Sequence, residues 1–317
     1  MTLKVLITPR SFGKGSPAPL EMLKNKGYEI VINPYGRIMT KEEMVSLIQD
    51  VDGVIVGVDP LDKEVLQHAR KLKVISKYGV GIDNVDTDYA KQMSIPVTVT
   101  AGANKEAVAD YAFALMLGTA RKLAQIDKEC KNVNWNKMTT IDMWGKTLGL
   151  IGLGNIGKGV AKRAGGFNMN VLAYDLFQDK AYAEANGIHY VPLETLLKES
   201  DFISMHLPLN EQTRHIIGSQ QFKIMKPTAV IVNTARGGLI DEEALFCALK
   251  ENQIWGAGID VFEQEPPHNK ELLGLDNIII GSHCAASTYG AIDEMGMMAS
   301  ANIIEHMAAK AEIIDAD

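Results

Sequence analysis

Three polar residues of the C-terminal half could together bind an anion and move a proton. Arg236 follows the apolar run AVIVNT, Glu265 follows GIDVFEQ, and His283 ends NIIIGSH. An arginine fork binds a carboxylate through two hydrogen bonds and polarises an adjacent carbonyl. Histidine is the usual general acid and base near neutral pH, and a neighbouring carboxylate fixes its tautomer. These residue types predict proton transfer next to a bound carboxylate.

Each of the three residues also has an ordinary structural interpretation. His283 could be a histidine with satisfied hydrogen bonds, Arg236 a cation at a helix start, and Glu265 a solvated loop acid. Their position favours the chemical interpretation, because ligands of open α/β sheets bind outside the carboxyl ends of the strands.

The stretch 148–175 has the pattern of a strand, a glycine turn, a helix and a second strand that ends in an acid. Gly152 permits a tight turn, Gly154 lets the backbone approach a pyrophosphate, and Gly157 allows the helix to pack closely on the strand. The free N–H groups of the helix start would face the phosphates. The pattern predicts a dinucleotide-binding unit. The alternative is a Rossmann-like unit that has lost its ligand.

Asp175 indicates which dinucleotide to expect. It closes the second strand, where a carboxylate accepts hydrogen bonds from the ribose hydroxyls and repels a 2′-phosphate. No arginine or lysine follows before Lys180. We therefore expect NAD rather than NADP.

Length and charge bound the class of protein. A chain of 317 residues predicts two domains, each with its own core. A net charge of −7 without any basic run predicts neither a nucleic acid nor an anionic membrane as partner. No apolar window reaches the roughly 18 residues that span a bilayer. The N-terminus enters a strand without a signal segment, so we expect a cytoplasmic protein.

The three cysteines are Cys130, Cys247 and Cys284, and their spacing matches no metal motif. We expect free thiols in a reducing compartment and no bound metal. Although Cys284 follows His283, nothing in its surroundings predicts a lowered thiol pKa, and we interpret it as a packing residue.

Strand patterns alternate with helical patterns, which predicts an α/β fold of two Rossmann-like, doubly wound parallel sheets. We expect a flavodoxin-like substrate domain of residues 1–100 with 286–317, an NAD-binding domain of residues 101–285, and a cleft between them. The strands of the first domain are expected at 4–8, 28–33, 53–57, 73–79 and 95–100. Those that follow the glycine turn are expected at 169–175, 201–207, 229–234, 256–262 and 277–283.

Three helical patterns carry specific expectations. Thr40 and Glu43 predict a capping box at a helix start, and Gly27 predicts a helix end. Residues 104–131 predict one long helix with apolar residues on more than one face. Because one sheet would not cover that much apolar surface, the long helix predicts a homodimer interface.

Four segments resemble the signatures of one enzyme family. They are KYGVGIDNVD (77–86), TARGGLIDEEAL (234–245), GIDVFEQEPP (258–267) and GSHCAAST (281–288). Over residues 3–310 the chain is similar to the D-isomer-specific 2-hydroxyacid dehydrogenases, and within them to D-3-phosphoglycerate dehydrogenases. The resemblance implies hydride transfer between NAD(H) and a 2-hydroxy or 2-keto acid, by a homodimer.

The resemblance also implies roles for individual residues. Arg236 would bind the substrate carboxylate and keto oxygen, Glu265 and His283 would form the acid/base dyad, and Asn84 would hold the substrate loop. The implied substrate-binding residues are Lys77, Tyr78, Gly79, Val80, Gly81, Arg236 and His283. The implied cofactor-binding residues are Gly152, Gly154, Asn155, Ile156, Gly157, Asp175, His206, Leu207, Pro208, Thr213, Thr234, Ala235, Arg236, Asp260, His283 and Ala285.

Three positions depart from the phosphoglycerate pattern. Gly57 stands where those enzymes commonly place an arginine for the phosphate, and Gly290 stands where a glutamate is usual. Lys77 replaces an arginine, and a lysine binds an anion only as a point charge.

We therefore expect an NAD-dependent D-2-hydroxyacid dehydrogenase with 3-phosphoglycerate as one candidate substrate. The alternative substrates are small 2-hydroxy acids of the glyoxylate or hydroxypyruvate, lactate or sulfolactate type. A non-enzymatic NAD-sensing protein is the alternative from another class, whereas a formate dehydrogenase relative would pair the histidine with glutamine in place of Glu265.

Overall fold

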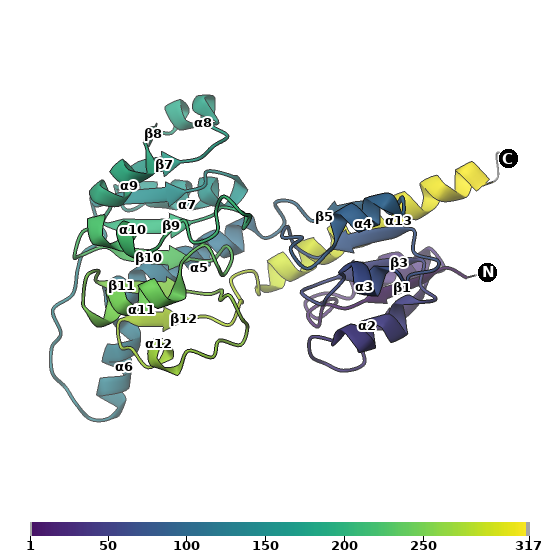
Figure 1. Cartoon of the computed structure of the whole chain (residues 1–317), viewed down its shortest axis with the longest axis horizontal. Coiled ribbons are helices and arrows are strands. Elements are labelled where there is room, and N and C mark those ends of the chain that lie inside the picture. Colours follow the sequence, from purple (N-terminus) through teal and green to yellow (C-terminus); the bar gives the residue numbers. More distant parts are fainter. Residues whose placement is uncertain (1, 315–317) are drawn as a thin grey trace. The chain divides into compact units, whose positions relative to one another are not determined.

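The computed structural model describes residues 2–314, which divide into two compact units. The first unit contains residues 1–104 and 287–317, and the second contains residues 105–286. The chain enters the second unit after Asn104 and returns to the first after Ala286 (Figure 1), whereas the sequence predicts these crossings after residues 100 and 285.

The first unit has a five-stranded parallel sheet in the order β2-β1-β3-β4-β5. This is the flavodoxin-like order, so the predicted fold of this domain is confirmed. Its strands are β1 (Lys4–Ile7), β2 (Glu29–Ile32), β3 (Gly53–Val56), β4 (Val74–Lys77) and β5 (Val97–Val99). Its helices are α1 (Ala18–Asn25), α2 (Lys41–Ile48), α3 (Lys63–Leu66), α4 (Thr87–Gln92) and α13 (Tyr289–Ile314).

Separate cores cover the two faces of this sheet. Residues of α2, α3 and α4 pack on one face, and Leu23 of α1 packs with α13 on the other. From α13, Ala299, Ile303 and Met307 reach the strand residues Val5, Ile7, Ile55 and Val74. The capping box of Thr40 and Glu43 starts α2 as predicted, and Gly27 follows α1 with φ 77°.

The second unit has a seven-stranded parallel sheet in the order β12-β11-β10-β9-β6-β7-β8. Counted from β6, this is the Rossmann order with one further strand, and the prediction of a doubly wound sheet is confirmed. The strands are β6 (Thr147–Ile151), β7 (Asn170–Tyr174), β8 (Ile188–Tyr190), β9 (Phe202–Met205), β10 (Val230–Asn233), β11 (Gly256–Ile259) and β12 (Ile278–Ile280). Sequence analysis did not predict β8, a three-residue edge strand.

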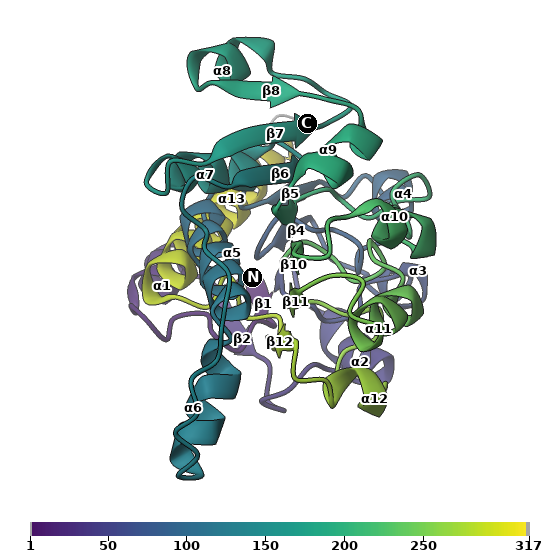
Figure 2. The same cartoon turned by 90° about the vertical axis from the view of Figure 1, so that its left-hand side faces the viewer.

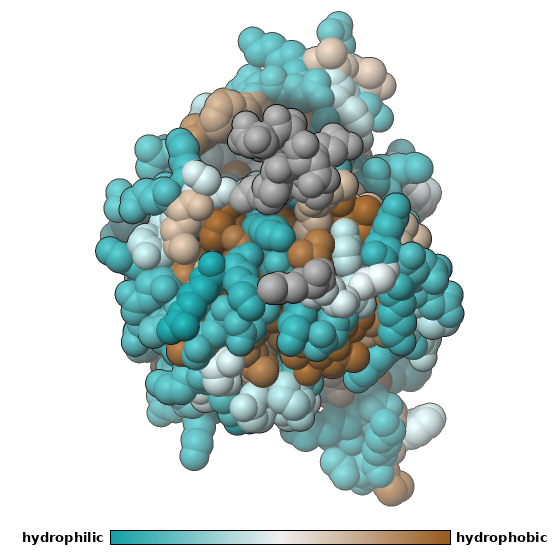
Figure 3. Space-filling view, turned by 90° about the vertical axis from the view of Figure 1, so that its right-hand side faces the viewer, coloured by the Kyte–Doolittle hydropathy of each residue, from teal (hydrophilic) through white to brown (hydrophobic). Residues whose placement is uncertain are grey.

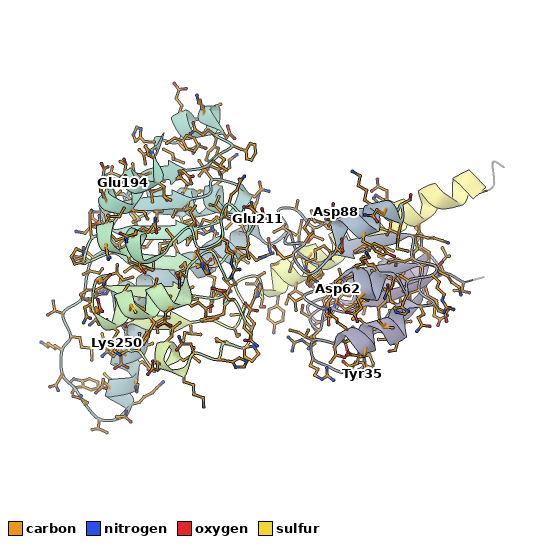
Figure 4. The ribbon with its side chains drawn as sticks, in the orientation of Figure 1. Tyr35, Asp62, Asp88, Glu194, Glu211 and Lys250 are labelled. Carbon is orange, nitrogen blue, oxygen red and sulfur yellow. The ribbon has the colours of Figure 1, made fainter. Side chains whose placement is uncertain are left out.

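Helices cover both faces of the second sheet (Figure 2). On one face lie α5 (Lys105–Ala120) and α7 (Asn155–Gly165), while α8 (Lys180–Ala185) adjoins the edge strand β8. On the other face lie α9 (Leu193–Glu199), α10 (Ser219–Ile224), α11 (Glu242–Lys250) and α12 (Lys270–Leu273). The charged residues of these helices point to solvent, as Glu194 of α9 and Lys250 of α11 show (Figure 4).

The single long helix predicted over 104–131 is wrong. The chain forms α5 and then α6 (Leu123–Lys131), because Lys122 adopts a left-handed backbone with φ 49°. Its ammonium lies 4.7 Å from the centre of the Trp255 ring, a contact that favours the break. The apolar faces of α5 are buried within the second unit between α7 and strands β10 and β11.

Exposed apolar side chains instead cluster after that break. Leu123, Val133, Trp135 and Trp144 are 57%, 89%, 83% and 66% exposed. On the face of the first unit shown in Figure 3, hydrophilic residues surround apolar areas. The segment 123–144 thus leaves two tryptophans and two aliphatic side chains largely in water.

Candidate active site

The glycine turn of the second unit lies where the strand order reverses, between β6 and β9. Gly152 has φ 103°, and its N–H donates to the carbonyl of Tyr174 at 2.8 Å. A Cβ built at Gly152 would lie 2.8 Å from the carbonyl carbon and oxygen of His206. Glycine is therefore required both by the turn and by the close approach of the His206 loop.

The start of α7 fits a dinucleotide. Gly154 is the N-cap of α7, and a Cβ built there would meet no atom within 4 Å. A Cβ built at Gly157 would collide with the carbonyl oxygen of Gly152, so glycine is needed where the helix meets the turn. Asn155 and Ile156 follow Gly154 in the first turn of α7. Backbone N–H groups of a helix start, next to open space, are the usual place for a pyrophosphate.

Two buried polar atoms near this edge have no partner among the described residues. They are the hydroxyl oxygen of Thr234 and Nδ1 of His206, both at positions predicted to contact the cofactor. The other ring nitrogen of His206 lies 2.9 Å from the hydroxyl of Ser204. Burial lowers the pKa of His206 to about 3, so its ring is neutral and has hydrogen-bonding capacity left for a ligand.

Asp175 follows β7, where the ribose is expected. Its carboxylate accepts from the backbone N–H of Leu153 at 2.8 Å and from that of Phe177 at 2.9 Å. The side chain thus holds the glycine turn in addition to the role predicted from its charge. Each carboxylate oxygen has further acceptor capacity for a ribose hydroxyl.

The predicted dyad is present in the second unit. Nδ1 of His283 lies 2.8 Å from Oε2 and 3.1 Å from Oε1 of Glu265. A hydrogen bond at Nδ1 leaves Nε2 to exchange a proton with a ligand. His283 has φ 55°, which is unusual for a residue other than glycine.

Glu265 is an ionised partner for this histidine. Burial acts to raise its pKa, but the hydrogen bond to His283 and the nearby positive charges outweigh burial. The N–H of Phe262 also donates to Oε1 at 3.1 Å. The pKa of Glu265 is therefore held below its ordinary value.

Arg236 lies in a loop that Asn233 organises. The Asn233 amide accepts from the N–H of Ala235 at 3.0 Å and donates to the carbonyl of Arg236 at 2.7 Å. A Cβ built at Gly237 would overlap the backbone of Phe262, so this loop packs directly on the loop that carries Glu265. Arg236 is also among the charges that lower the pKa of Glu265. The structure thus brings all three predicted groups to one edge of one sheet.

Asp260 holds the backbone on which His283 sits. Its buried carboxylate accepts from the N–H of Cys284 at 3.0 Å and from that of Ala285 at 2.8 Å, and its carbonyl accepts from the N–H of His283 at 2.8 Å. The thiol of Cys284 lies 3.3 Å from the hydroxyl of Tyr111. Sequence analysis missed the supporting roles of Asn233 and Tyr111, because neither belongs to a motif that names its partner.

The remaining predicted cofactor positions lie in the loop after β9. The Thr213 hydroxyl donates to the carbonyl of Pro208 at 2.7 Å and closes this loop. Leu207 packs against the core of the second unit, and Pro208 is exposed. Thr213 therefore shapes the loop that Leu207 and Pro208 begin.

The predicted substrate loop belongs to the first unit, at the carboxyl end of β4. Lys77 is buried, and its ammonium contacts the carbonyl of Gly57 and, at 2.7 Å, Oδ1 of Asn84. Asn84 also donates to the carbonyls of Gly57 at 3.0 Å and Asp59 at 2.5 Å. Lys77 and Asn84 therefore tie the loops after β3 and β4 together.

The hydrogen-bonding groups of the same loop are only partly used by the protein. The N–H of Gly79 donates to the Thr100 hydroxyl at 2.8 Å, and the Tyr78 hydroxyl donates to the carbonyl of Ile292. Within residues 2–314, the N–H groups of Val80 and Gly81 donate to no protein atom. Two adjacent free N–H groups can bind an anion.

A Rossmann-type sheet with a glycine turn, together with an arginine and a Glu–His dyad at the carboxyl edge, defines a nucleotide-dependent oxidoreductase. Residues 113–285 match the model of the D-isomer specific 2-hydroxyacid dehydrogenase, NAD binding domain. The chain belongs to this family. It is an NAD-dependent oxidoreductase that acts on the CH–OH group of its donors.

Similar proteins whose names state an activity support the same assignment. A glyoxylate reductase of Korarchaeum cryptofilum is 42% identical over 84% of this chain and 82% of its own. A D-3-phosphoglycerate dehydrogenase of Methanocaldococcus jannaschii is 44% identical over 84% of this chain, but over only 51% of its own length. The structure of D-lactate dehydrogenase from Aquifex aeolicus, complexed with NAD and lactic acid, has 30% identity and a TM-score of 0.84. The match covers 99% of this chain and 98% of that chain.

No helix within residues 2–314 has the length and apolar character to cross a membrane. In the same part of the chain, no three histidine, cysteine or acidic side chains are grouped as metal ligands would be.

Proposed function

We propose that this protein reduces small 2-keto acids of the glyoxylate and hydroxypyruvate class to the corresponding 2-hydroxy acids with NADH. The observation that carries the proposal is the Glu265–His283 pair, 2.8 Å apart, on the same sheet edge as Arg236. The glyoxylate reductase named above supports this class of substrate. The absence of an arginine at Gly57 argues against 3-phosphoglycerate held in the manner of phosphoglycerate enzymes.

Each residue has a defined task in this proposal. Arg236 binds the carboxylate of the keto acid and polarises its carbonyl. His283, protonated and held at Nδ1 by Glu265, gives a proton from Nε2 to the carbonyl oxygen as negative charge develops there. NADH supplies the hydride to the keto carbon when it is bound. In the oxidative direction neutral His283 accepts the hydroxyl proton.

The substrate carboxylate would have a second set of donors in the substrate loop. The free N–H groups of Val80 and Gly81 support this role, since two backbone donors match two carboxylate oxygens. Lys77 and Asn84 would act through the loop they hold.

We also propose a cytoplasmic homodimer. The exposed apolar side chains of the segment 123–144 support self-association, because soluble proteins rarely leave large apolar patches in water. The cysteines Cys130, Cys247 and Cys284 are unpaired, as expected in a reducing compartment.

Replacement of His283 tests the proposed function. NADH absorbance is followed with glyoxylate, hydroxypyruvate and pyruvate, for the wild type and for His283→Ala. We expect a loss of turnover of about 10²- to 10⁴-fold with NADH binding retained. His189→Ala, which alters an exposed histidine on β8, is the control and should keep full activity. Unreduced activity of His283→Ala would remove the histidine from its role.

A further inference from the structure

A short turn after β1 lies against both substrate-side loops of the first unit. The N–H of Phe12 donates to the carbonyl of Pro9 at 3.2 Å, so Arg10 and Ser11 occupy the middle of this turn. A Cβ built at Gly57 would lie 3.5 Å from atoms of Pro9. At its other end, the Phe12 ring packs 5.8 Å from the Tyr78 ring, centre to centre. The turn therefore links the loops that follow β3 and β4.

Arg10 is the exposed residue of this turn, and its charge is not used by the part of the chain that the structure describes. Among the described residues, no carboxylate or carbonyl accepts a hydrogen bond or forms an ion pair with Arg10. By contrast, Arg37, Arg163 and Arg214 each pair with a glutamate. A guanidinium at the carboxyl edge of a parallel sheet is available to a ligand anion.

Lys77, the other cation at this edge of the sheet, cannot bind a ligand anion in its observed position. Lys77 is only 5% exposed and is bound to Gly57 and Asn84. Residue 57 has no side chain, and Pro9 lies directly beside it. Within the turn of residues 9–12, Arg10 is therefore the cation that can meet a ligand anion beside the loops after β3 and β4.

The strand order determines how far the Arg10 side chain must extend to meet a substrate at the loop after β4. Strands β1, β3 and β4 are consecutive neighbours in the sheet. Neighbouring strands lie about 4.8 Å apart, so the ends of β1 and β4 are roughly 10 Å from each other. An arginine side chain that extends from the β1 loop can meet a substrate whose carboxylate is bound by Val80 and Gly81.

We propose that Arg10 determines substrate specificity by binding a second anionic group attached at C3 of the 2-keto acid. This inference rests on the proposed function and adds the class of preferred substrate. A carboxylate, sulfonate or phosphate at C3 offers two or more oxygens to the guanidinium fork. Glyoxylate, which has no C3, and hydroxypyruvate, whose C3 carries a neutral hydroxyl, would not use Arg10.

The test compares the two kinds of substrate in Arg10→Ala. The substrates are glyoxylate and hydroxypyruvate on one side, and oxaloacetate, sulfopyruvate and 3-phosphohydroxypyruvate on the other. We expect kcat/KM for the best substrate with an anionic group at C3 to fall about 10- to 100-fold, as for loss of a charged hydrogen bond. For glyoxylate it should stay within about twofold. Arg10→Lys should recover part of the loss, because it keeps the charge without the fork.

Arg70→Ala is the matched control. Arg70 is another exposed arginine of the first unit, but it precedes β4 and so lies toward the amino end of the same sheet. The net charge changes by the same amount in both variants. A selective loss in Arg10→Ala that is absent from Arg70→Ala supports a local contact.

The outcomes separate the inference from the proposed function. Equal kcat/KM changes for both kinds of substrate in Arg10→Ala, or no change, overturn the role of Arg10. If the wild type reduces glyoxylate but no substrate with an anionic group at C3, the role of Arg10 is also overturned, while the proposed function stays intact. Failure of the wild type to reduce any member of the panel overturns both. Unfolding midpoints of the variants show whether a uniform loss comes from misfolding.

Discussion

Many polar side chains of the site act on the backbone of the loops that surround it. Asp260 binds two N–H groups next to His283, and Asp175 binds two around the glycine turn. Lys77 and Asn84 instead donate to backbone carbonyls of the loop after β3 in the first unit. The sequence predicts such residues by type and position, but the partner atoms come from other strands. A motif therefore indicates that a residue is needed without showing whether it serves the ligand or the loop.

Glu265 leads to a prediction about pH. Because its pKa is lowered in the folded protein, ionised Glu265 stabilises the fold above its unfolded pKa near 4.3, and this stability is lost as pH falls through the folded pKa. Glu265→Gln removes the charge. We expect the wild type to exceed the variant in unfolding midpoint at pH 7, by a small amount because water screens a carboxylate that is 35% exposed.

The gap between the two midpoints should narrow when pH is lowered from about 5 to below 4. Thermal unfolding of both proteins at pH 7, 5 and 4 measures it. A gap that is independent of pH would mean that the charge of Glu265 contributes nothing to stability.

At the scale of elements, the prediction of strands succeeded where the strands are buried on both faces. VIVN of β10 and FISM of β9 are fully buried, and such apolar runs are typical of parallel sheets. The edge strand β8 is only three residues long, and its exposed residues give no comparable signal. The break at Lys122 was missed because the contact that favours it involves Trp255, more than a hundred positions away.

The loop 283–285 gives a prediction at this scale. In Asp260→Asn, one side-chain oxygen becomes an NH₂ group that cannot accept from a backbone N–H. Because Asp260 is 1% exposed, we expect a loss of about 1–3 kcal/mol in the free energy of unfolding. We also expect a fall in kcat of at least about tenfold, since the His283 backbone loses its support.

Asp201→Asn is the control for that variant. Asp201 likewise accepts from a backbone N–H, that of Thr147 at 3.0 Å, but it does so at the amino end of β6. It should lose stability while keeping kcat near the wild-type value. Similar kcat losses in both variants would assign the effect of Asp260 to general destabilisation.

At the scale of the whole molecule, the exposed segment 123–144 bears on assembly. If it is the dimer interface, Trp135→Glu places a charge in an apolar contact, and the mass in solution should fall from two chains to one. Light scattering measures the mass. Phe177→Glu is the control, because Phe177 is 90% exposed and lies outside this segment. A wild type that is already monomeric, or an unchanged mass of Trp135→Glu, would contradict the proposed interface.

The return of α13 to the first unit has a consequence for biosynthesis. Val5, Ile7, Ile55 and Val74 are translated before residues 105–286, whereas Ala299, Ile303 and Met307, which pack on them, are translated after those residues. One apolar face of the first sheet, which α1 covers only in part, therefore lacks α13 at first, while residues 105–286 form a continuous stretch that can fold as it emerges. During that interval the nascent chain presents the kind of surface that chaperones bind.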